Sequence, residues 1–355
     1  MERHYLTPLF NPRSLIVFAG DPDAEPPTRE ARALRASLGD ATTRPDSERF
    51  AGPVVWLDIA MTGTLADLAA SRADLALIAL PQAQCEAALE VVGRIRCRAA
   101  LVLTNGLDAA QCTKLHQIAR RYDVNLLGPN SLGLQRPALK LNASALGPIA
   151  AAGPLALVSQ SGALTAAMLD WARHNGVGFS SVVSLGPNTA VELPQVLDFL
   201  AGDAATQSIL VYMEGIRHAR RFMSALRAAA GAKPVVVMKA GRHAAGSRVA
   251  RTHSAAIVGS DDVFEAALRR AGVVRVRQFT QLFSAAQCLA SRFRPVGERL
   301  AMVTNGGGPA VLAADWAQSL GLKVGHVADL GEDAPPEAYV LAMQAAVANR
   351  DADGV

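Results

Sequence analysis

One histidine of the sequence stands where a parallel α/β sheet would place a reactive side chain. The β-branched apolar run at residues 235–239 predicts a buried parallel strand, which Gly241 ends. The small, glycine-punctuated segment 242–259 predicts a loop, and it carries His253. Because ligands bind at the carboxyl ends of strands in open α/β sheets, His253 is a candidate nucleophile or acid–base group. The plainer alternative is a surface loop histidine without a chemical role.

A second strand end could hold an anion beside such a histidine. Residues 155–159 predict a strand that enters a tight turn at Ser161-Gly162 and then a helix. Backbone N–H groups of Ser161, Gly162 and Ala163 would point at an anion there, and the helix dipole would favour it. The hydroxyls of Ser159 and Ser161 can donate further hydrogen bonds. Many strand–helix turns carry Ser-Gly as plain caps, so the turn alone does not establish a site.

A third strand end supplies a carboxylate. Residues 208–213 predict another buried strand, and Glu214 follows it directly. A carboxylate at this edge can orient a histidine ring and stabilise its positive charge. The alternative is a salt-bridged or helix-capping glutamate. Since Ser161, Glu214 and His253 all follow strand carboxyl ends, a flavodoxin-like sheet would bring the three to one edge.

The order of strands and helices that must position these groups predicts tandem, doubly wound α/β domains with parallel sheets. Apolar strands alternate with amphipathic helices in residues 12–148 and again from 155 to about 294. The glycine- and proline-containing stretch 147–154 is the best linker, so we expect domains at residues 1–149 and 150–295. A strand and glycine-rich turn then begin a third α/β domain, residues 296–355, which is too short to be complete. We expect a fragment of a longer polypeptide or a subunit that needs a partner.

Composition excludes several classes of function. The chain has 355 residues, half of them apolar and 19% charged, which suits large cores. Its formal charge is only +4 and has no basic stripe, so no nucleic-acid partner is expected. The four cysteines lack metal-ligand spacing and indicate reduced thiols in a cytoplasmic protein. No secretory signal opens the chain and no apolar run reaches the roughly 18 residues needed to span a bilayer, so no membrane partner is expected.

Several long motifs in the right order resemble the α-type region of nucleoside-diphosphate-forming acyl-CoA synthetases, the relatives of succinyl-CoA synthetase. The matching pieces are residues 157–164, 183–186, 209–216, 233–242, 252–255 and 259–261. Residues 126–133 match a motif of the CoA-binding, Rossmann-like domain that opens that family. The resemblance covers about the first 320 residues and extends to the N-terminal part of fused protein acetyltransferases.

The resemblance implies roles for the three strand ends. In the synthetases a loop histidine carries a phosphoryl group, and that histidine corresponds to His253. Its glutamate partner maps onto Glu214, and the turn that holds the phosphate maps onto Ser161 and Gly162, with Ser159 beside them. ATP or another nucleoside triphosphate, with magnesium, would be handled by a nucleotide-grasp domain or β subunit. The substrates would be a small carboxylate and CoA, no resident metal site is implied, and a homo-oligomer is compatible with this reading.

The resemblance also places CoA in the first domain, where the sequence departs from the family. Candidate cofactor contacts are Gly20, Pro81, Thr104, Asn105, Gly106 and Asn130. The family has a glycine-rich turn after the first strand, but here only Gly20 remains, followed by Asp21, Pro22 and Asp23. Carboxylates repel a polyanionic cofactor and proline lacks an N–H donor, so we expect weak CoA binding. The alternative for each candidate is ordinary turn chemistry.

Two further departures leave a second class of function open. Ala190 stands where relatives carry an aspartate, and Ser254-Ala255 stands where they prefer Thr-Gly. These changes favour a non-catalytic or regulatory module that senses CoA or acyl-CoA in a fused protein acyltransferase, or a degenerate synthetase-like protein. The retained His253 and Glu214 favour chemistry. A dehydrogenase is the weakest alternative, because the chain lacks the Gly-x-Gly-x-x-Gly turn.

Overall fold

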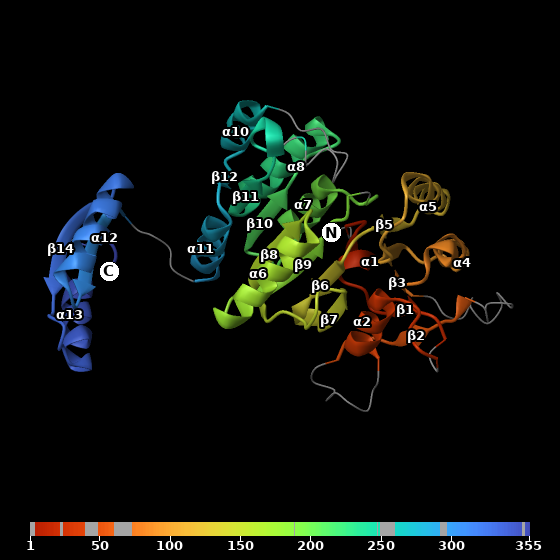
Figure 1. Ribbon diagram of the computed structural model, residues 1–355, viewed down its shortest axis with the longest axis horizontal. Helices are drawn as coiled ribbons and strands as arrows, with labels where there is room; N and C mark the ends of the chain where they lie inside the picture. The colour runs from red at the N-terminus through yellow and green to blue at the C-terminus, as the bar shows by residue number, and fades with distance from the viewer. Residues whose placement is uncertain are drawn as a thin grey trace. The chain divides into compact units, whose positions relative to one another are not determined.

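The computed structural model describes most of the chain in two compact units, Met1–Ser291 and Arg292–Val355 (Figure 1). The described residues are 4–21, 24–39, 49–59, 73–187, 189–246, 248, 260–291, 297–349 and 352–355. His253 and the Ser254-Ala255 pair lie outside them. No described helix is both long enough and apolar enough to cross a membrane.

The first unit begins with a five-stranded parallel sheet. In spatial order its strands are β2 (Val54–Trp56), β1 (Leu15–Phe18), β3 (Leu75–Ile78), β4 (Ala99–Val102) and β5 (Asn125–Leu127). The accompanying helices are α1 (Thr7–Phe10), α2 (Arg29–Leu38), α4 (Cys85–Arg94) and α5 (Ala109–Arg121). Every residue of β1, β3 and β4 is buried, as expected when helices cover both faces of a parallel sheet. The strand order changes direction between β1 and β3, so a ligand crevice is expected at their carboxyl ends.

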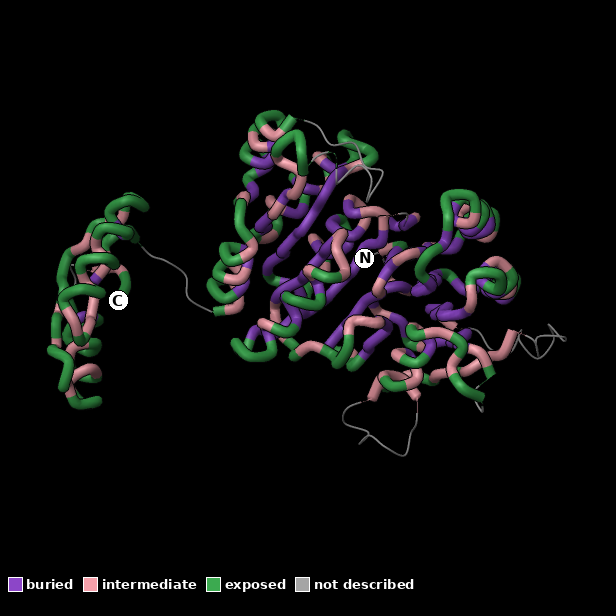
Figure 2. The backbone as a smooth tube through the Cα atoms, viewed as in Figure 1, coloured by how far each residue is buried: buried purple, intermediate pink, exposed green. Residues whose placement is uncertain are grey.

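A seven-stranded sheet forms the rest of this unit. In spatial order its strands are β12 (Val274–Val276), β11 (Val235–Lys239), β10 (Ser208–Met213), β8 (Ala152–Ser159), β9 (Phe179–Ser184), β6 (Gly133–Arg136) and β7 (Leu141–Ser144). One face packs on α7 (Leu193–Gly202), α8 (Ala219–Ala232) and α10 (Asp261–Arg270), and the other packs on α6 (Gly162–His174) and α11 (Phe279–Ala290). In Figure 2 the buried strands run beneath partly exposed helices.

The tandem doubly wound architecture predicted from sequence is confirmed, with one difference. The strands from β12 to β9 are parallel, whereas β6 is antiparallel to both β9 and β7. The sequence predicts that residues 147–154 separate the two sheets, but β6 and β7 precede that linker and pair with the second sheet. The change of sheet therefore falls within residues 128–132, and the domain boundary at residue 149 stays a prediction.

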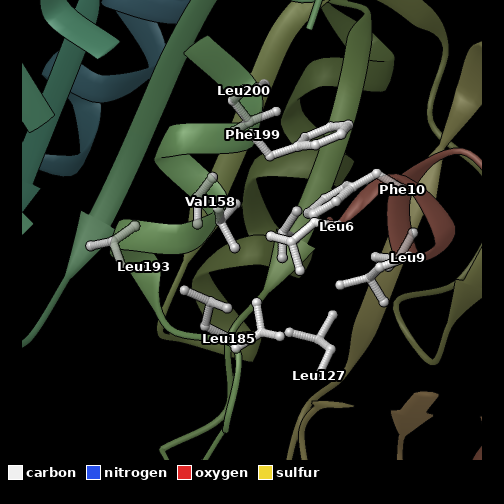
Figure 3. Packing of buried hydrophobic residues seen from close by; sticks show 14 of the residues in the cluster. Leu6, Leu9, Phe10, Leu127, Val158, Leu185, Leu193, Phe199 and Leu200 are labelled. Atoms are coloured by element: carbon white, nitrogen blue, oxygen red, sulfur yellow. The ribbon is translucent and has the colours of Figure 1, made fainter. Parts of the chain in front are cut away.

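The two sheets share a hydrophobic core. Figure 3 shows Phe10, from the start of the chain, lying beside Phe199 of α7, and Leu6, Leu9 and Leu200 belong to the same apolar cluster. The rings of Phe10 and Phe199 stack with their centroids 4.3 Å apart. Because the N-terminal segment belongs to the first sheet's layer and α7 to the second, this packing makes Met1–Ser291 a single body.

The second unit is a smaller α/β element. Its strands β13 (Arg299–Thr304) and β14 (Lys323–Asp329) are parallel, and its helices are α12 (Gly307–Ser319) and α13 (Pro336–Ala348). Large apolar side chains on both helices are exposed, among them Leu312, Trp316 and Val347. The element order agrees with the start of a third α/β domain, whose boundary at residue 296 remains a prediction.

Candidate functional site

The turn after β8 is built by hydroxyl groups. Ser161 is the N-cap of α6, and its Oγ accepts a hydrogen bond from the backbone N–H of Leu164 at 3.3 Å. The buried Ser159 hydroxyl donates to the Ser161 carbonyl at 2.9 Å and accepts from the Ser161 N–H at 3.1 Å. Thr165 Oγ1 donates to the same carbonyl at 2.7 Å. The two serine hydroxyls therefore hold the turn itself.

This turn offers two anion donors rather than the three that the sequence predicts. The Ser161 N–H is taken by Ser159 Oγ. The N–H groups of Gly162 and Ala163, in the first turn of α6, meet no acceptor among the described residues. A Cβ at position 162 would meet the Leu132 side chain, which would have to shift to admit a larger residue. Two donors at the positive end of a 13-residue helix suit an anion such as a phosphoryl group.

Glu214 lies one residue beyond β10 and is 7% exposed. Its backbone N–H donates to Gln160 Oε1 at 2.7 Å, and the Gly215 N–H donates to the same oxygen at 3.2 Å. Gln160 Nε2 donates to the Gly215 carbonyl at 3.1 Å. Gln160, which the sequence analysis did not select, thus joins the phosphate-type turn to the strand end that carries Glu214. The sequence feature that could have identified Gln160 is its position between Ser159 and Ser161, at the end of a predicted strand.

The Glu214 carboxylate interacts with Tyr212, two residues earlier on the same side of the strand. The pKa of Tyr212 is raised to about 12, mainly by burial and also by the charge of Glu214 and its hydrogen bond with the phenol. The phenol is therefore neutral at physiological pH and donates to the carboxylate. Tyr212 holds Glu214 in place at the edge of the sheet.

We expect Glu214→Gln to lower the pKa of Tyr212 without restoring its ordinary value, because burial, the largest cause of the shift, remains. The measurement is tyrosinate absorbance as a function of pH, with Tyr212→Phe as the variant that identifies the Tyr212 titration. An unchanged titration in Glu214→Gln would show that the two side chains do not interact.

The segment that contains His253 starts and ends at this same edge of the sheet. Arg242 follows β11, and Asp261 is the first residue of α10. Arg242 Nε lies 3.5 Å from Asp261 Oδ2, and Arg275 of β12 donates to Asp261 Oδ1. Since β8, β10 and β11 are neighbours in one parallel sheet, Arg242 leaves that sheet at the carboxyl edge that carries Ser161 and Glu214. The position of His253 itself stays a prediction.

The CoA candidates lie at strand ends of the first sheet, and two of them have structural roles. Pro81 follows β3, and Thr104-Asn105-Gly106 follows β4. Thr104 Oγ1 donates to the Leu80 carbonyl at 2.7 Å. Asn130, with a φ of +56°, pairs its side-chain amide with both the N–H and the carbonyl of Leu107, at 3.2 and 3.1 Å. Both side chains are engaged in holding loops.

Two charged side chains that the sequence analysis did not select make hydrogen bonds to residues that follow strands of the first sheet. Arg35 of α2 donates to the carbonyls of Ala19 at 3.0 Å and Asp21 at 2.6 Å, on either side of Gly20. Gly20 has a φ of +78°, which glycine accommodates. Glu30, in the first turn of α2, accepts from Asn105 Nδ2 at 2.9 Å. A carboxylate of the protein therefore stands at a helix N-terminus where a phosphate would otherwise be favoured.

Ala190 helps to join the two sheets. It packs against the apolar cluster of the first sheet, and its N–H donates to the Gly128 carbonyl at 3.3 Å. The adjacent Thr189 Oγ1 accepts from the Gly128 N–H at 2.9 Å. Ala190 therefore makes an apolar contact at a place where an aspartate would bring a charge.

Within the described residues, no group of three or more histidine, cysteine, aspartate or glutamate side chains is arranged to hold a metal ion. Three of the cysteines, Cys85, Cys97 and Cys112, are buried free thiols. Burial raises the pKa of the Cys97 thiol to about 12, which makes it unreactive at neutral pH.

Residues 152–289 match the family described as the succinyl-CoA ligase like flavodoxin domain. The chain is 38% identical over 259 residues to acetate–CoA ligase (ADP-forming) I of Archaeoglobus fulgidus, covering 71% of this chain and 38% of that protein. It is 36% identical over 256 residues to the α subunit of acetate–CoA ligase (ADP-forming) I of Pyrococcus furiosus, covering 70% and 55%. The chain thus spans less than two thirds of either relative.

Among solved structures, the dinucleotide forming acetyl-coenzyme A synthetase 1 of Ca. Korarchaeum cryptofilum, in complex with phosphate and ADP, superposes with a TM-score of 0.84. The two are 26% identical, and the match covers 98% of this chain and 80% of the other. The fold is therefore shared along nearly the whole sequence.

Proposed function

This chain belongs to the nucleoside-diphosphate-forming acyl-CoA synthetases, as their α-type region, and we propose that it carries the phosphorylated histidine of such an enzyme. The observation that supports this most is the meeting of the Ser161–Gly162 turn and Glu214 at one sheet edge. The segment with His253 leaves the sheet at that edge. A turn whose N–H groups could bind a phosphoryl group and a carboxylate that could partner an imidazole therefore support a role for this histidine.

The proposed reaction has three balanced steps. An imidazole nitrogen of His253 attacks the γ-phosphorus of a nucleoside triphosphate, and the bond to the departing nucleoside diphosphate breaks. A substrate carboxylate oxygen then attacks that phosphorus, the N–P bond breaks so that the imidazole of His253 is released, and an acyl phosphate forms. Last, the CoA thiol loses its proton and attacks the acyl carbon, so that phosphate leaves and acyl-CoA forms. The nucleotide and its magnesium would be bound by a nucleotide-grasp domain or β subunit.

The residues of this chain have distinct roles in that scheme. The Gly162 and Ala163 N–H groups, with the α6 dipole, would hold the transferring phosphoryl group. Glu214 would hold the imidazole nitrogen opposite the attacking one and stabilise the imidazolium, while Tyr212 keeps the carboxylate in place. We also propose a cytoplasmic location, which the free thiols favour.

The test is transfer of label from a γ-labelled nucleoside triphosphate to the full-length protein, or to this chain mixed with its nucleotide-binding partner. A phosphohistidine on this chain would support the proposal. Absence of label with every nucleoside triphosphate would overturn it.

One observation favours a second candidate, a regulatory module that senses CoA or acyl-CoA weakly. At the strand ends of the first sheet, where the resemblance places CoA, Arg35 and Glu30 make hydrogen bonds to the protein itself. A site arranged in this way suits a sensor that responds only at high ligand concentration. In that case the chain would bind acyl-CoA without becoming phosphorylated.

We expect the unaltered chain to bind CoA weakly and Glu30→Gln to bind it about two- to fivefold more tightly, as the ~0.3–1 kcal/mol of a charge at a helix N-terminus implies. Replacing Asp21, Pro22 and Asp23 with glycine should raise affinity further, because N–H donors are restored and carboxylates are lost. Titration calorimetry measures both. The matched control is Asp170→Asn, which removes an exposed carboxylate 3.6 Å from Arg173 on α6, away from the first sheet. Micromolar binding by the unaltered chain would contradict the expectation.

A further inference from the structure

The ladder between β8 and β10 ends before the site is reached. Parallel pairing of the two strands stops at Ser159↔Tyr212. Beyond that pair, the chain after β8 turns away into the helix cap at Ser161, whereas β10 extends one residue further, to Met213, and the chain then passes through Glu214 and Gly215. Backbone groups on the continuing segment therefore lose their strand partner at the place where Glu214 must be held.

The side chain of Gln160 takes over the pairing there. Its Oε1 accepts from the N–H groups of Glu214 and Gly215, at 2.7 and 3.2 Å, and its Nε2 donates to the Gly215 carbonyl at 3.1 Å. The backbone N–H of Gln160 donates to the Tyr212 carbonyl at 3.1 Å. The side-chain amide of Gln160 thus accepts two hydrogen bonds and donates one, as the backbone of a neighbouring strand would otherwise do.

We propose that Gln160 is a positioning residue for phosphoryl transfer, one that fixes the Glu214 carboxylate relative to the Gly162 and Ala163 N–H donors. The inference rests on the proposed function. Gln160 directly precedes the turn that would hold the phosphoryl group, and its amide bonds the backbone of the residue that would hold the imidazole. Transfer requires both at once, and a misplacement of about 1 Å can lower a rate by about a hundredfold.

The same sheet offers a matched control in Gln135 of β6. Its Nε2 donates to Ser144 Oγ at 3.1 Å and to the Pro148 carbonyl at 3.3 Å, and its Oε1 accepts from the Ala150 N–H at 2.9 Å. Gln135 is fully buried, so losing its bonds should destabilise the fold at least as much as losing those of Gln160. Among the described residues, its side-chain hydrogen bonds go to Ser144, Pro148 and Ala150, which precede β8, whereas the phosphate-type turn follows that strand.

The experiment compares Gln160→Met with Gln135→Met in the full-length protein or the complex with its nucleotide-binding partner. Methionine is close to glutamine in size and makes none of the three hydrogen bonds. For Gln160→Met we expect a labelling rate per folded molecule about ten- to a hundredfold below wild type, with an unchanged KM for the nucleotide. For Gln135→Met we expect lower stability and an unchanged labelling rate.

Amide hydrogen exchange supplies a readout that does not depend on activity. Exchange at Glu214 and Gly215 should accelerate in Gln160→Met, while the rest of β10 keeps its protection. Gln160→Glu retains an acceptor for both N–H groups and should restore that protection.

Labelling of Gln160→Met within about twofold of wild type, or equal to that of Gln135→Met, would overturn the positioning role. So would unchanged exchange at Glu214 and Gly215. If wild type itself takes up no label, the proposed function falls and the positioning role falls with it. That failure is recognised in the wild-type protein alone, before any variant is compared.

Discussion

His253→Ala is expected to abolish transfer of phosphate from a γ-labelled nucleoside triphosphate to this chain. A phosphorylated imidazole forms a P–N bond, so the adduct should be labile in acid and stable in base, unlike a phosphoserine. The measurement is labelling of the full-length protein, or of the chain with its nucleotide-binding partner, followed by treatment at both extremes of pH. Alanine removes the nucleophile, and the hydroxyls of Ser159 and Ser161 are engaged in hydrogen bonds within the turn, so we do not expect them to take the phosphoryl group in its place.

His243→Ala is the matched control, since it removes an exposed histidine from the same stretch of chain. It should leave labelling unchanged. Glu214→Gln should keep the fold and lower the labelling rate by about 10²–10⁴, as for other groups that assist proton transfer or orient a base. Label that survives in His253→Ala would remove this histidine from the mechanism. An unlabelled wild type would turn attention to the second candidate, for which acyl-CoA binding without phosphorylation is the expected behaviour.

The strand ends that carry the site could be predicted because local sequence determines them. The runs at 208–213 and 235–239 are apolar on both faces, and the structure forms β10 and β11 over the same residues. Helix α6 begins at Gly162 because Ser161 caps it, which the Ser-Gly pair indicates. With the order of strands and helices, these features were sufficient to predict that Ser161 and Glu214 would meet at one edge.

The remaining features depend on partners far away in sequence. Strands β6 and β7 are short and partly polar, and Gln135 is buried only because Ser144, Pro148 and Ala150 satisfy its amide. The sequence also did not predict that Arg35 would bond to the turn after β1, because the carbonyls that it reaches lie more than ten residues earlier in the chain. The hydrogen bond from the Ser161 N–H to Ser159 Oγ could not be predicted either, because it depends on how the turn bends.

Breaking the buried ion pair of Arg136 and Asp203 is expected to give the largest loss of stability. Arg136 Nη1 lies 2.7 Å from Asp203 Oδ2, and both side chains are less than a tenth exposed. Arg136 Nη2 also donates to Asn11 Oδ1 at 2.8 Å, and Thr206 Oγ1 donates to Asp203 Oδ2 at 2.8 Å. Asn11 ends α1, Arg136 belongs to β6 and Asp203 ends α7, so the network joins the N-terminal segment to the second sheet.

Asp203→Asn should lower the free energy of unfolding by about 3–5 kcal/mol, because the buried guanidinium of Arg136 loses its counter-charge. Urea unfolding at neutral pH measures the difference. The matched control is Asp198→Asn, a partly exposed carboxylate on the same helix, 3.1 Å from His4, which should cost at most about 1 kcal/mol. A loss of less than about 1 kcal/mol in Asp203→Asn would contradict the expectation.

The dependence of stability on pH shows how much of the contribution of Asp203 comes from its charge, because asparagine keeps the shape of the side chain and cannot ionise. Burial alone would raise the pKa of Asp203, but the hydrogen bond and charge of Arg136 hold it below the ordinary value. A carboxyl group whose pKa is lower in the folded state stabilises fully above its unfolded pKa, and that stabilisation is lost as the pH falls through the folded pKa. Unfolding followed through this acidic range should therefore show a steeper loss of stability in wild type than in Asp203→Asn.

The double variant Arg136→Met/Asp203→Asn should be more stable than Asp203→Asn, because no unpaired buried charge remains. Equal stability of the two would mean that the ion pair contributes packing alone.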